Sequence, residues 1–380
     1  MIILLSALLC QDLKPLEFLV GSFEGKGESP LGAYEESMTA DWSLNKTVII
    51  LRSRSRSGET TVFEDIRTFS TDGKKIRLRQ FALGDVAEYD VTVDGKKITF
   101  TETAHEGNAR PEWRYTLTVE GPDAFSYVVE TKDGAEVVHG SLTRRVPDPG
   151  QAGVMGYEDY TEKIGESDAQ IYYPKEGAGP FPVLVLSPGG QAETTRGYEG
   201  FGRWFASWGY VTVVVAFNTD TAEERADRYS TALDWLIKKN AEKEWKLAGK
   251  LDTTRFVSAG HSRGGAACII AARKDKRFMA CLAMAPSGPE TIEGDNAPAV
   301  CLISGDLGDA EMCTTIFGKF AKPKHQVTVA GMDHFFNPQE KAMVLIKYST
   351  AFLNVAVRGD ARYRKFLTEK AEGVTVRSEE

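Results

Sequence analysis

The chain has 380 residues, of which 42% are hydrophobic and 26% are charged, and its formal net charge is -8 at pH 7. This length exceeds what one hydrophobic core usually serves, so we expect two domains. The negative charge argues against nucleic acid as a partner, because phosphate contacts and counterion release require a basic surface. No internal apolar run of the sequence approaches the length of a membrane helix, so we expect no stable membrane insertion.

The first ten residues, MIILLSALLC, form a short apolar run that ends before the polar Gln11. Such a run is typical of a secretory signal peptide, so residues 1–10 predict cleavage near Cys10 and a secreted or periplasmic protein. No positive charge precedes the run, and Leu9 occupies a position where a lipoprotein signal requires a small residue. An apolar arm packed on the first domain is the alternative interpretation.

Residues 11–146 consist of short alternating segments separated by turn-forming pairs such as Asp94-Gly95 and Asp133-Gly134. The alternation, seen for example in Tyr115, Leu117 and Val119, gives each segment one buried face, as in a β-strand. Nine or ten such strands without helical periodicity predict an antiparallel β-barrel domain that closes its own edges.

The two ends of this region resemble a known family. The stretch from Leu16 to Gly27 and the closing strand from Gly140 to Arg145 are similar to lipocalin-like barrels related to nitrobindin. The resemblance implies an interior that takes a small apolar ligand, and members of that family can bind haem through a histidine. Here His139 is the only strand candidate, since His105 falls in a loop-like stretch, and a lone strand histidine is more often a surface or packing residue. We therefore predict no cofactor.

Residues 147–155 are rich in Pro and Gly and lack an apolar period, which predicts a linker. From residue 156 to 380, apolar runs typical of strands buried on both faces alternate with helical stretches. The clearest helix begins with the capping-box pattern Thr221-Ala222-Glu223-Glu224 and continues toward Lys239. This alternation predicts an α/β domain with a mostly parallel sheet flanked by helices. The apolar runs are Val183–Leu186, Val211–Val215, Phe256–Ala259 and Val300–Ile303.

The motif Gly260-His261-Ser262-Arg263-Gly264-Gly265 directly follows one of these strands and precedes an apolar helix. So tight a turn forces the serine into a strained backbone conformation and exposes its Oγ, and the two flanking glycines leave room for neighbouring backbone. The helix N-terminus adds free N–H groups where an oxyanion would form. The motif in this context predicts the α/β-hydrolase fold, with Ser262 as the nucleophile.

A serine hydroxyl needs a base, which in this fold comes late in the chain, and His334 lies in a loop after the strand-like Gln326–Val329. The acid is expected between the two, where Asp306 and Asp309 follow the strand that ends at Ser304. We favour Asp309, because it has cleared the strand end and can turn back to the imidazole, whereas Asp306 is better placed to cap a turn.

The first strand of the predicted sheet ends in Ser187-Pro188-Gly189-Gly190-Gln191. We expect the backbone N–H groups of Gly190 and Arg263 to form the oxyanion hole, because two amides fixed by the fold can meet the developing charge without reorganising. Gln191, next to Gly190, is a candidate substrate contact. No metal or organic cofactor is needed for this chemistry.

At residues 180 to 366 the chain resembles the polyester-hydrolysing cutinases, PET hydrolases included, and the related dienelactone-hydrolase-like and chlorophyllase-like esterases. The resemblance implies a serine carboxylic-ester hydrolase that acts on a small-molecule or polymeric ester. Gly190 and Ser287 stand where the polyesterases carry aromatic residues, so both aromatic walls are absent, and Ser287 and Phe335 are candidate substrate contacts. The resemblance rests on Leu186–Gly189, Phe205–Val211, Leu251–Arg255, the serine motif, Asp333–Phe335, Lys347–Ser349 and Asp360–Tyr363.

Alternatives from two classes, other acyl hydrolases and a binding protein, stay open. An amidase or a thioesterase needs the same triad, and a ligand-binding barrel could be joined to a degenerate hydrolase domain.

Four cysteines in apolar segments are expected to be core thiols, with a disulfide as the alternative. They are Cys268, Cys281, Cys301 and Cys313.

Overall fold

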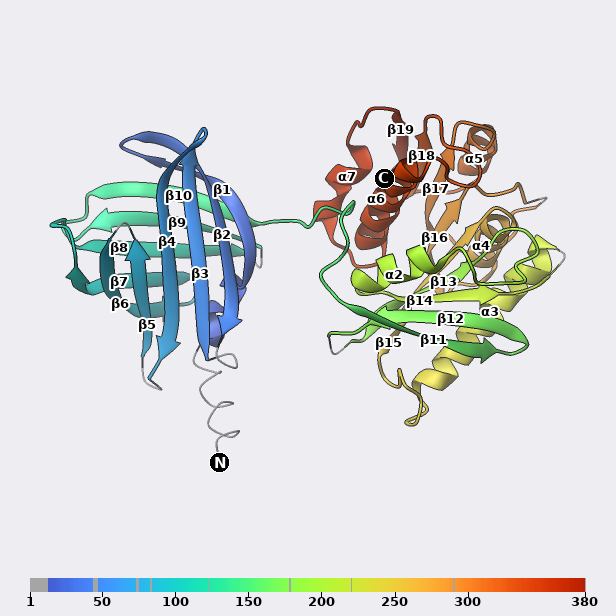
Figure 1. The fold of residues 1–380 in the computed structure, drawn as a ribbon, viewed down its shortest axis with the longest axis horizontal. Helices are drawn as coiled ribbons and strands as arrows, with labels where there is room; N and C mark the ends of the chain where they lie inside the picture. Colours follow the sequence, from blue (N-terminus) through green and yellow to red (C-terminus); the bar gives the residue numbers. More distant parts are fainter. Residues whose placement is uncertain are drawn as a thin grey trace. The chain divides into compact units, whose positions relative to one another are not determined.

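A computed structural model describes residues 13–43, 47–72, 75–82, 84–121, 123–177, 179–219, 221–289 and 291–379. The chain divides into two compact units, Met1–Arg145 and Val146–Glu380 (Figure 1). The signal peptide predicted at residues 1–10 lies outside the described residues.

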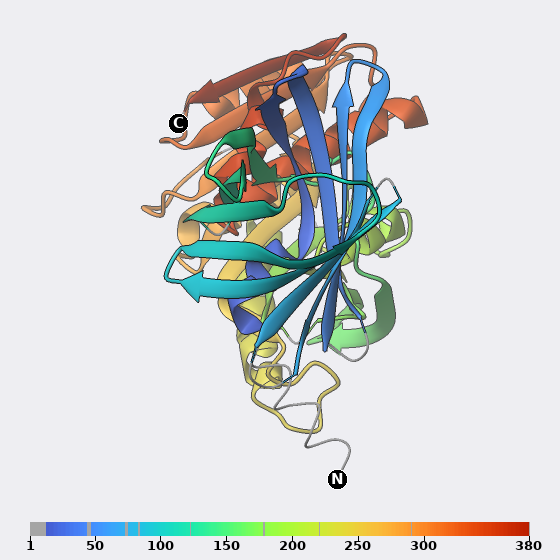
Figure 2. The same cartoon turned by 90° about the vertical axis from the view of Figure 1, so that its left-hand side faces the viewer.

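The first unit is a 3-10 helix followed by ten antiparallel strands that close into a barrel, in the order β1-β10-β9-β8-β7-β6-β5-β4-β3-β2. In the turned view of Figure 2 the blue strands β1 to β4 lie side by side, in agreement with their pairing. The helix is η1 (Lys14–Leu19), and the strands are β1 (Gly21–Ser29), β2 (Gly32–Ser43), β3 (Val48–Ser57), β4 (Thr60–Thr71), β5 (Ile76–Ala82), β6 (Asp85–Asp94), β7 (Lys97–Glu106), β8 (Trp113–Gly121), β9 (Ala124–Thr131) and β10 (Glu136–Arg144).

Alternation along the strands explains this barrel. In β2, Tyr34, Glu36, Met38 and Ala40 are buried while the residues between them are exposed, so one face of the strand points inward. The prediction of an antiparallel barrel with nine or ten strands is confirmed. The assignment of His105 to a loop was wrong, because the residue lies near the end of β7, where pairing with β6 extends the strand.

The second unit holds a nine-stranded sheet in the order β11-β12-β14-β13-β15-β16-β17-β18-β19. The sheet is mixed: the six strands from β14 to β18 pair in parallel, whereas β11, β12 and β19 pair antiparallel at the edges. The strands are β11 (Tyr157–Ile164), β12 (Ser167–Pro174), β13 (Phe181–Ser187), β14 (Val211–Ala216), β15 (Leu251–His261), β16 (Phe278–Met284), β17 (Ala299–Gly305), β18 (Lys324–Val329) and β19 (Val374–Glu379).

The prediction of a mostly parallel sheet missed these antiparallel edges. β11 and β19 are largely half-buried or exposed, so neither carries the continuous apolar run by which the central strands were recognised. β12 is more buried, but it begins with polar residues that hide its strand character.

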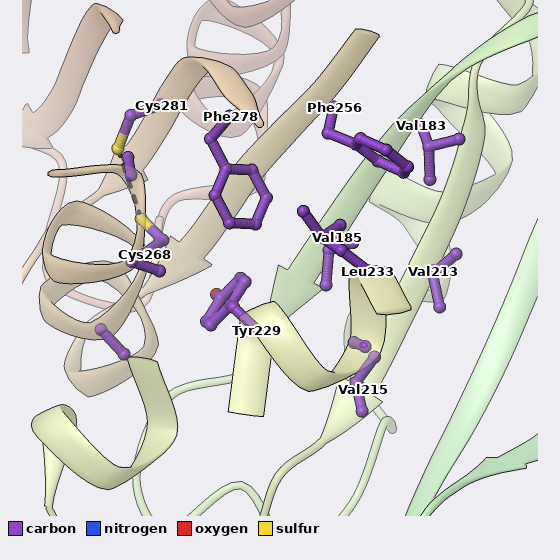
Figure 3. Close-up of a cluster of buried hydrophobic side chains, with 14 of the residues drawn as sticks. Val183, Val185, Val213, Val215, Tyr229, Leu233, Phe256, Cys268, Phe278 and Cys281 are labelled. Carbon is purple, nitrogen blue, oxygen red and sulfur yellow. Dashed lines mark hydrogen bonds between the residues drawn. The ribbon is translucent and has the colours of Figure 1, made fainter. Parts of the chain in front are cut away.

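Helices cover both faces of the sheet, because neighbouring residues of a central strand point to opposite sides (Figure 1). Val183 and Val185 join a core with α3, α4 and α5, whereas Leu184 and Leu186 join a second core with α2 and α6. Figure 3 shows part of the first core. The helices are α2 (Glu199–Ser207), α3 (Ala222–Asn240), α4 (Arg263–Lys274), α5 (Ala310–Phe317), α6 (Gln339–Ala356), η2 (Ala361–Tyr363) and α7 (Arg364–Thr368).

Local sequence explains where α3 begins. Its N-cap is Thr221, whose side chain accepts a hydrogen bond from the amide of Glu224, as the capping-box pattern predicts.

All four cysteines of the second unit are buried free thiols, and the Sγ atoms of Cys268 and Cys281 lie 3.7 Å apart between α4 and β16 (Figure 3). In the part of the chain that the structure describes, no helix is long and apolar enough to cross a membrane.

The segment 147–155, which the sequence predicts as a linker, belongs to the second unit and makes hydrogen bonds with α2 and the residue after it. The amide of Gly153 donates to Ser207 Oγ at 2.9 Å, and Trp208 Nε1 donates to the carbonyl of Gln151 at 3.0 Å. This segment is therefore fastened to the C-terminal end of α2.

Candidate active site

Ser262 lies at the sharp turn between β15 and α4, with φ 56° and ψ -120°. This left-handed backbone is strained for any residue but glycine, and such strain is commonly kept at functional sites. A Cβ at Gly260 would collide with the backbone of Gly264, and a Cβ at Gly264 would collide with the backbone of Ser187. The glycines are therefore required by close backbone approach, and the turn raises Ser262 Oγ from the end of the sheet.

Three side chains from three segments meet at this turn. Ser262 Oγ lies 2.9 Å from His334 Nε2, and His334 Nδ1 lies 2.9 Å from Asp309 Oδ1. Because a carboxylate only accepts, Nδ1 carries the proton and Nε2 is free to accept from the serine hydroxyl. Asp309 Oδ2 is buried without a hydrogen-bond partner among the described residues.

The other two carboxylates near the site have different partners. Asp306 Oδ1 accepts from the amide of Gly331 at 2.7 Å, which ties the loop after β17 to the loop after β18. Asp333, although adjacent to His334, accepts from the amides of Phe335 and Asn337 at 2.8 and 2.9 Å. Of the acids considered, Asp309 is the one that contacts the imidazole.

The loop after β13 borders the serine. A Cβ at Gly189 would lie 3.2 Å from the Ser262 Cβ, which shows how closely the two segments approach. Among the described residues, the amides of Gly190 and Arg263 have no hydrogen-bond partner. Neither amide is therefore occupied by another described group, as the role predicted for them from the sequence requires.

Arg225, a residue of α3, forms hydrogen bonds with the loop that follows β13. Its side chain is fully buried and donates to the carbonyls of Pro188 at 3.0 Å and Gly190 at 2.9 Å. It also donates to the carbonyl of Thr219 at 3.2 Å. Arg225 therefore fixes two carbonyls of the loop that follows β13.

His261, next to the nucleophile, joins the two loops. Its Nε2 lies 2.9 Å from the carbonyl of His334, so Nε2 must donate, and its Nδ1 therefore accepts from the hydroxyl of Tyr198 at 2.7 Å. The same hydroxyl accepts from the amide of Gly189 at 2.8 Å. Burial lowers the pKa of His261 to about 4, so the ring is neutral near pH 7 and keeps both hydrogen bonds.

The candidate substrate contacts, Gln191, Ser287 and Phe335, are all exposed, but they differ in the surface that they offer to a ligand. The amide of Ser287 donates to the carbonyl of Ser262 at 3.0 Å, and its side chain is exposed, as is Gln191. Phe335 is 73% exposed, with its ring centroid 5.3 Å from that of His334. Phe336 and Trp208 are both buried, so of these three aromatic residues only Phe335 offers a surface to a ligand.

Residues 148–380, more than half of the chain, match the family model described as PETase, PET hydrolase-like. The chain belongs to the PET hydrolase-like family. It is therefore a hydrolase.

Several curated proteins are similar to this chain over about half of its length. Cutinase 2 of Thermobifida cellulosilytica is 26% identical over 211 residues, which cover 53% of this chain and 78% of that protein. Cutinase cut1 of Thermobifida fusca is also 26% identical, over 53% of this chain and 64% of its own length. A bis(hydroxyethyl) terephthalate hydrolase of Streptomyces coelicolor is 26% identical over 220 residues, 53% of this chain and 66% of that protein.

Sequence reasoning missed two residues of this PET hydrolase-like site. Arg225 had a detectable signal, because it lies on the same face of α3 as the buried Tyr229 and Leu233, where a charged residue needs a special partner. Tyr198 had none, since its contact with His261 depends on how α2 packs. Within the described residues no group of three or more His, Cys, Asp or Glu side chains is placed to hold a metal ion.

Proposed function

We propose that this hydrolase is a serine carboxylic-ester hydrolase that works through an acyl-enzyme on Ser262. The observation that carries the proposal is the unbroken hydrogen-bonded series from Ser262 through His334 to Asp309, set at a strained turn at the end of the sheet. This arrangement is the one that makes a serine hydroxyl nucleophilic at neutral pH.

The geometry supports a two-step reaction. Ser262 Oγ attacks the ester carbonyl carbon while His334 Nε2 takes the hydroxyl proton, and Asp309 stabilises the imidazolium that results. The amides of Gly190 and Arg263 bind the oxyanion. When the tetrahedral intermediate collapses, His334 returns the proton to the leaving alcohol. A water molecule, activated by His334, then cleaves the acyl-enzyme and releases the carboxylic acid.

We further propose that flexible aliphatic acyl esters are better substrates than rigid aromatic ones. Gly190 and Ser287 are exposed and carry no ring, and Phe335 is the one exposed aromatic surface among the candidates beside His334. An aromatic acyl group therefore has fewer partners for stacking, at on the order of 0.5 to 1.5 kcal/mol for each missing ring contact. The relatives include both cutinases and a bis(hydroxyethyl) terephthalate hydrolase, so the two ester classes are the appropriate comparison.

The test measures kcat/KM of the full chain and of Ser262→Ala for p-nitrophenyl butyrate and for bis(hydroxyethyl) terephthalate. We expect the unmodified enzyme to prefer the butyrate and the variant to lose both activities, together with labelling by a fluorophosphonate probe. The circular dichroism spectrum of Ser262→Ala should match that of the unmodified chain, because Ser262 Oγ is not a core group. Substantial activity in Ser262→Ala would refute the assignment of Ser262 as the nucleophile. A preference for the terephthalate would refute only the proposed substrate class.

We also propose that the chain is exported. This rests on the apolar run at residues 1–10. Amino-terminal sequencing of the protein recovered from its native host checks the proposal: a mature chain that begins near residue 11 supports it, and an intact Met1 contradicts it.

A further inference from the structure

The barrel encloses a cavity of about 240 Å³ that the hydrolase chemistry does not use. Most of its wall is apolar. At one end of the barrel the buried leucines of the η1 segment, Leu13, Leu16 and Leu19, belong to the same core as the strands. At the other, the lining reaches the hairpin ends, where Leu31 and Val62 are exposed. The apolar lining includes Met38, Leu51, Phe69, Leu78, Phe100, Leu117, Phe125 and Leu142.

Among the described residues that line the cavity, Arg67 is the one cation. Its Nε donates to Asp65 at 2.7 Å, and Asp65 also accepts from Ser53 and Gln80, so this carboxylate is fully engaged. The guanidinium carbon lies 5.4 Å from the centroid of the Tyr115 ring. Among the described residues, no hydrogen bond is made by either terminal nitrogen of Arg67.

Glu36 is the one carboxylic acid among the described residues of the lining, and two tyrosines hold it. The hydroxyl of Tyr127 donates to Glu36 Oε2, and the hydroxyl of Tyr34 lies 2.6 Å from that of Tyr127. Burial raises the pKa of the Glu36 carboxyl. Within the described residues no ion pair joins Glu36 to Arg67, although both line the same cavity. The Glu36 carboxyl, an acceptor, and the terminal nitrogens of Arg67, which are donors, therefore line the same cavity without forming an ion pair with each other.

The charges of Arg67, Asp65 and Glu36 determine which kind of head group can bind between Arg67 and Glu36. Arg67 is already neutralised by Asp65, so an anionic head group would add a further acidic group beside Glu36 at a buried site. A cationic head group would face the unpaired donors of Arg67. A hydroxyl meets neither penalty, because it accepts from Arg67 and donates to Glu36.

We propose that the barrel binds an uncharged amphipathic alcohol, with its hydroxyl between Arg67 and Glu36 and its apolar body along the leucine and phenylalanine walls. A cavity of 150 Å³ accommodates benzene, so 240 Å³ holds roughly ten non-hydrogen atoms. A saturated nine-carbon alcohol has this size. The proposal concerns the barrel alone and stands whether or not Ser262 is the nucleophile.

The experiment compares 1-nonanol, nonanoate and nonylammonium by isothermal titration calorimetry with the full chain at pH 7. None of the three contains a bond that an ester hydrolase cleaves. We expect 1-nonanol to bind at least about ten-fold more tightly than either ion, the equivalent of about 1.4 kcal/mol. Tighter binding of nonanoate than of 1-nonanol would overturn the proposal.

Variants locate the binding site. Met38→Trp fills part of the cavity and should weaken 1-nonanol binding at least about ten-fold, whereas Met343→Trp, at an exposed position of α6, is the matched control and should leave it unchanged. Glu36→Gln keeps an acceptor but removes the charge, so it should retain 1-nonanol affinity and improve nonanoate affinity. If folded Met38→Trp binds 1-nonanol as the unmodified chain does, or if Glu36→Gln leaves the ratio of the two affinities unchanged, the assignment is wrong.

Discussion

At the scale of single residues, Asp309 and Asp306 show how three positions along a loop separate two roles. Asp309 Oδ1 accepts from His334, whereas Asp306 Oδ1 accepts from the backbone of the neighbouring loop. One carboxylate is therefore in a position to set the imidazole tautomer, and the other fastens the segment that carries it.

We predict that Asp309→Asn lowers kcat by as much as ~10⁴-fold, because an amide in place of the carboxylate favours the wrong tautomer of His334. Asp306→Asn keeps an acceptor oxygen for Gly331 and is the matched control, with a much smaller effect. Steady-state kinetics on p-nitrophenyl butyrate decides between them. A loss confined to Asp306→Asn would reassign the acid.

His261 supplies a prediction about pH. Its pKa is about 4 in the folded chain against 6.5 for the free side chain, so between these values the unfolded chain binds more protons. The free energy of unfolding therefore falls as the pH is lowered from 6.5 to 4, by about 3 kcal/mol from this residue. In His261→Gln the amide can still accept from Tyr198 and donate to His334, but it does not titrate.

Urea unfolding at pH 6.5 and pH 4 measures this effect, with the unmodified chain losing more stability than His261→Gln over the same interval. Equal losses in the two proteins would mean that His261 is not buried in its neutral form. Kinetic parameters at pH 7 serve as the check that the variant retains the site.

At the scale of elements, α3 does more than cover the sheet. Through Arg225 it fixes the carbonyls of Pro188 and Gly190, in the loop whose Gly190 amide we propose as an oxyanion donor. Since the side chain does not itself reach Ser262 in these contacts, Arg225 is a positioning residue.

We predict that Arg225→Met lowers kcat by up to ~100-fold while KM changes little, because a loop displaced by about 1 Å misaligns a group that acts mainly in the transition state. Arg228→Met, on the same helix but outside this set of hydrogen bonds, is the control. A rise in KM with kcat intact would show instead that the loop serves substrate binding.

At the scale of the whole molecule, each unit has its own hydrophobic core. Both cores of the second unit consist of residues from that unit, and so do the contacts of Ser262, His334 and Asp309. The barrel core is likewise formed within the first unit. The described cores and the contacts of the three site residues are thus each contained within one unit.

We predict that a chain of residues 146–380 folds cooperatively and retains the kcat/KM of the full chain for p-nitrophenyl butyrate. Thermal unfolding followed by circular dichroism reports on the fold, and the kinetic assay reports on the site. A truncated chain that unfolds cooperatively but is inactive would contradict this independence.

The sequence predicted the features that depend on local patterns and chain order. Alternation predicted the barrel, continuous apolar runs predicted the central strands, and the strand–turn–helix context of Ser262 led to the choice of His334, because each pattern is contained in a few neighbouring residues. The antiparallel edge strands were missed because a half-exposed strand has no such pattern.

Tertiary structure alone decided the contacts between segments far apart in the chain. The sequence favoured Asp309 but could not measure its distance to His334, and it gave no indication that Tyr198 and His261 join two loops. The donors of Arg67 and the acceptor of Glu36 meet one cavity only because the barrel closes. Such contacts depend on how strands and helices pack, and packing is set by the whole set of burial energies rather than by any one segment.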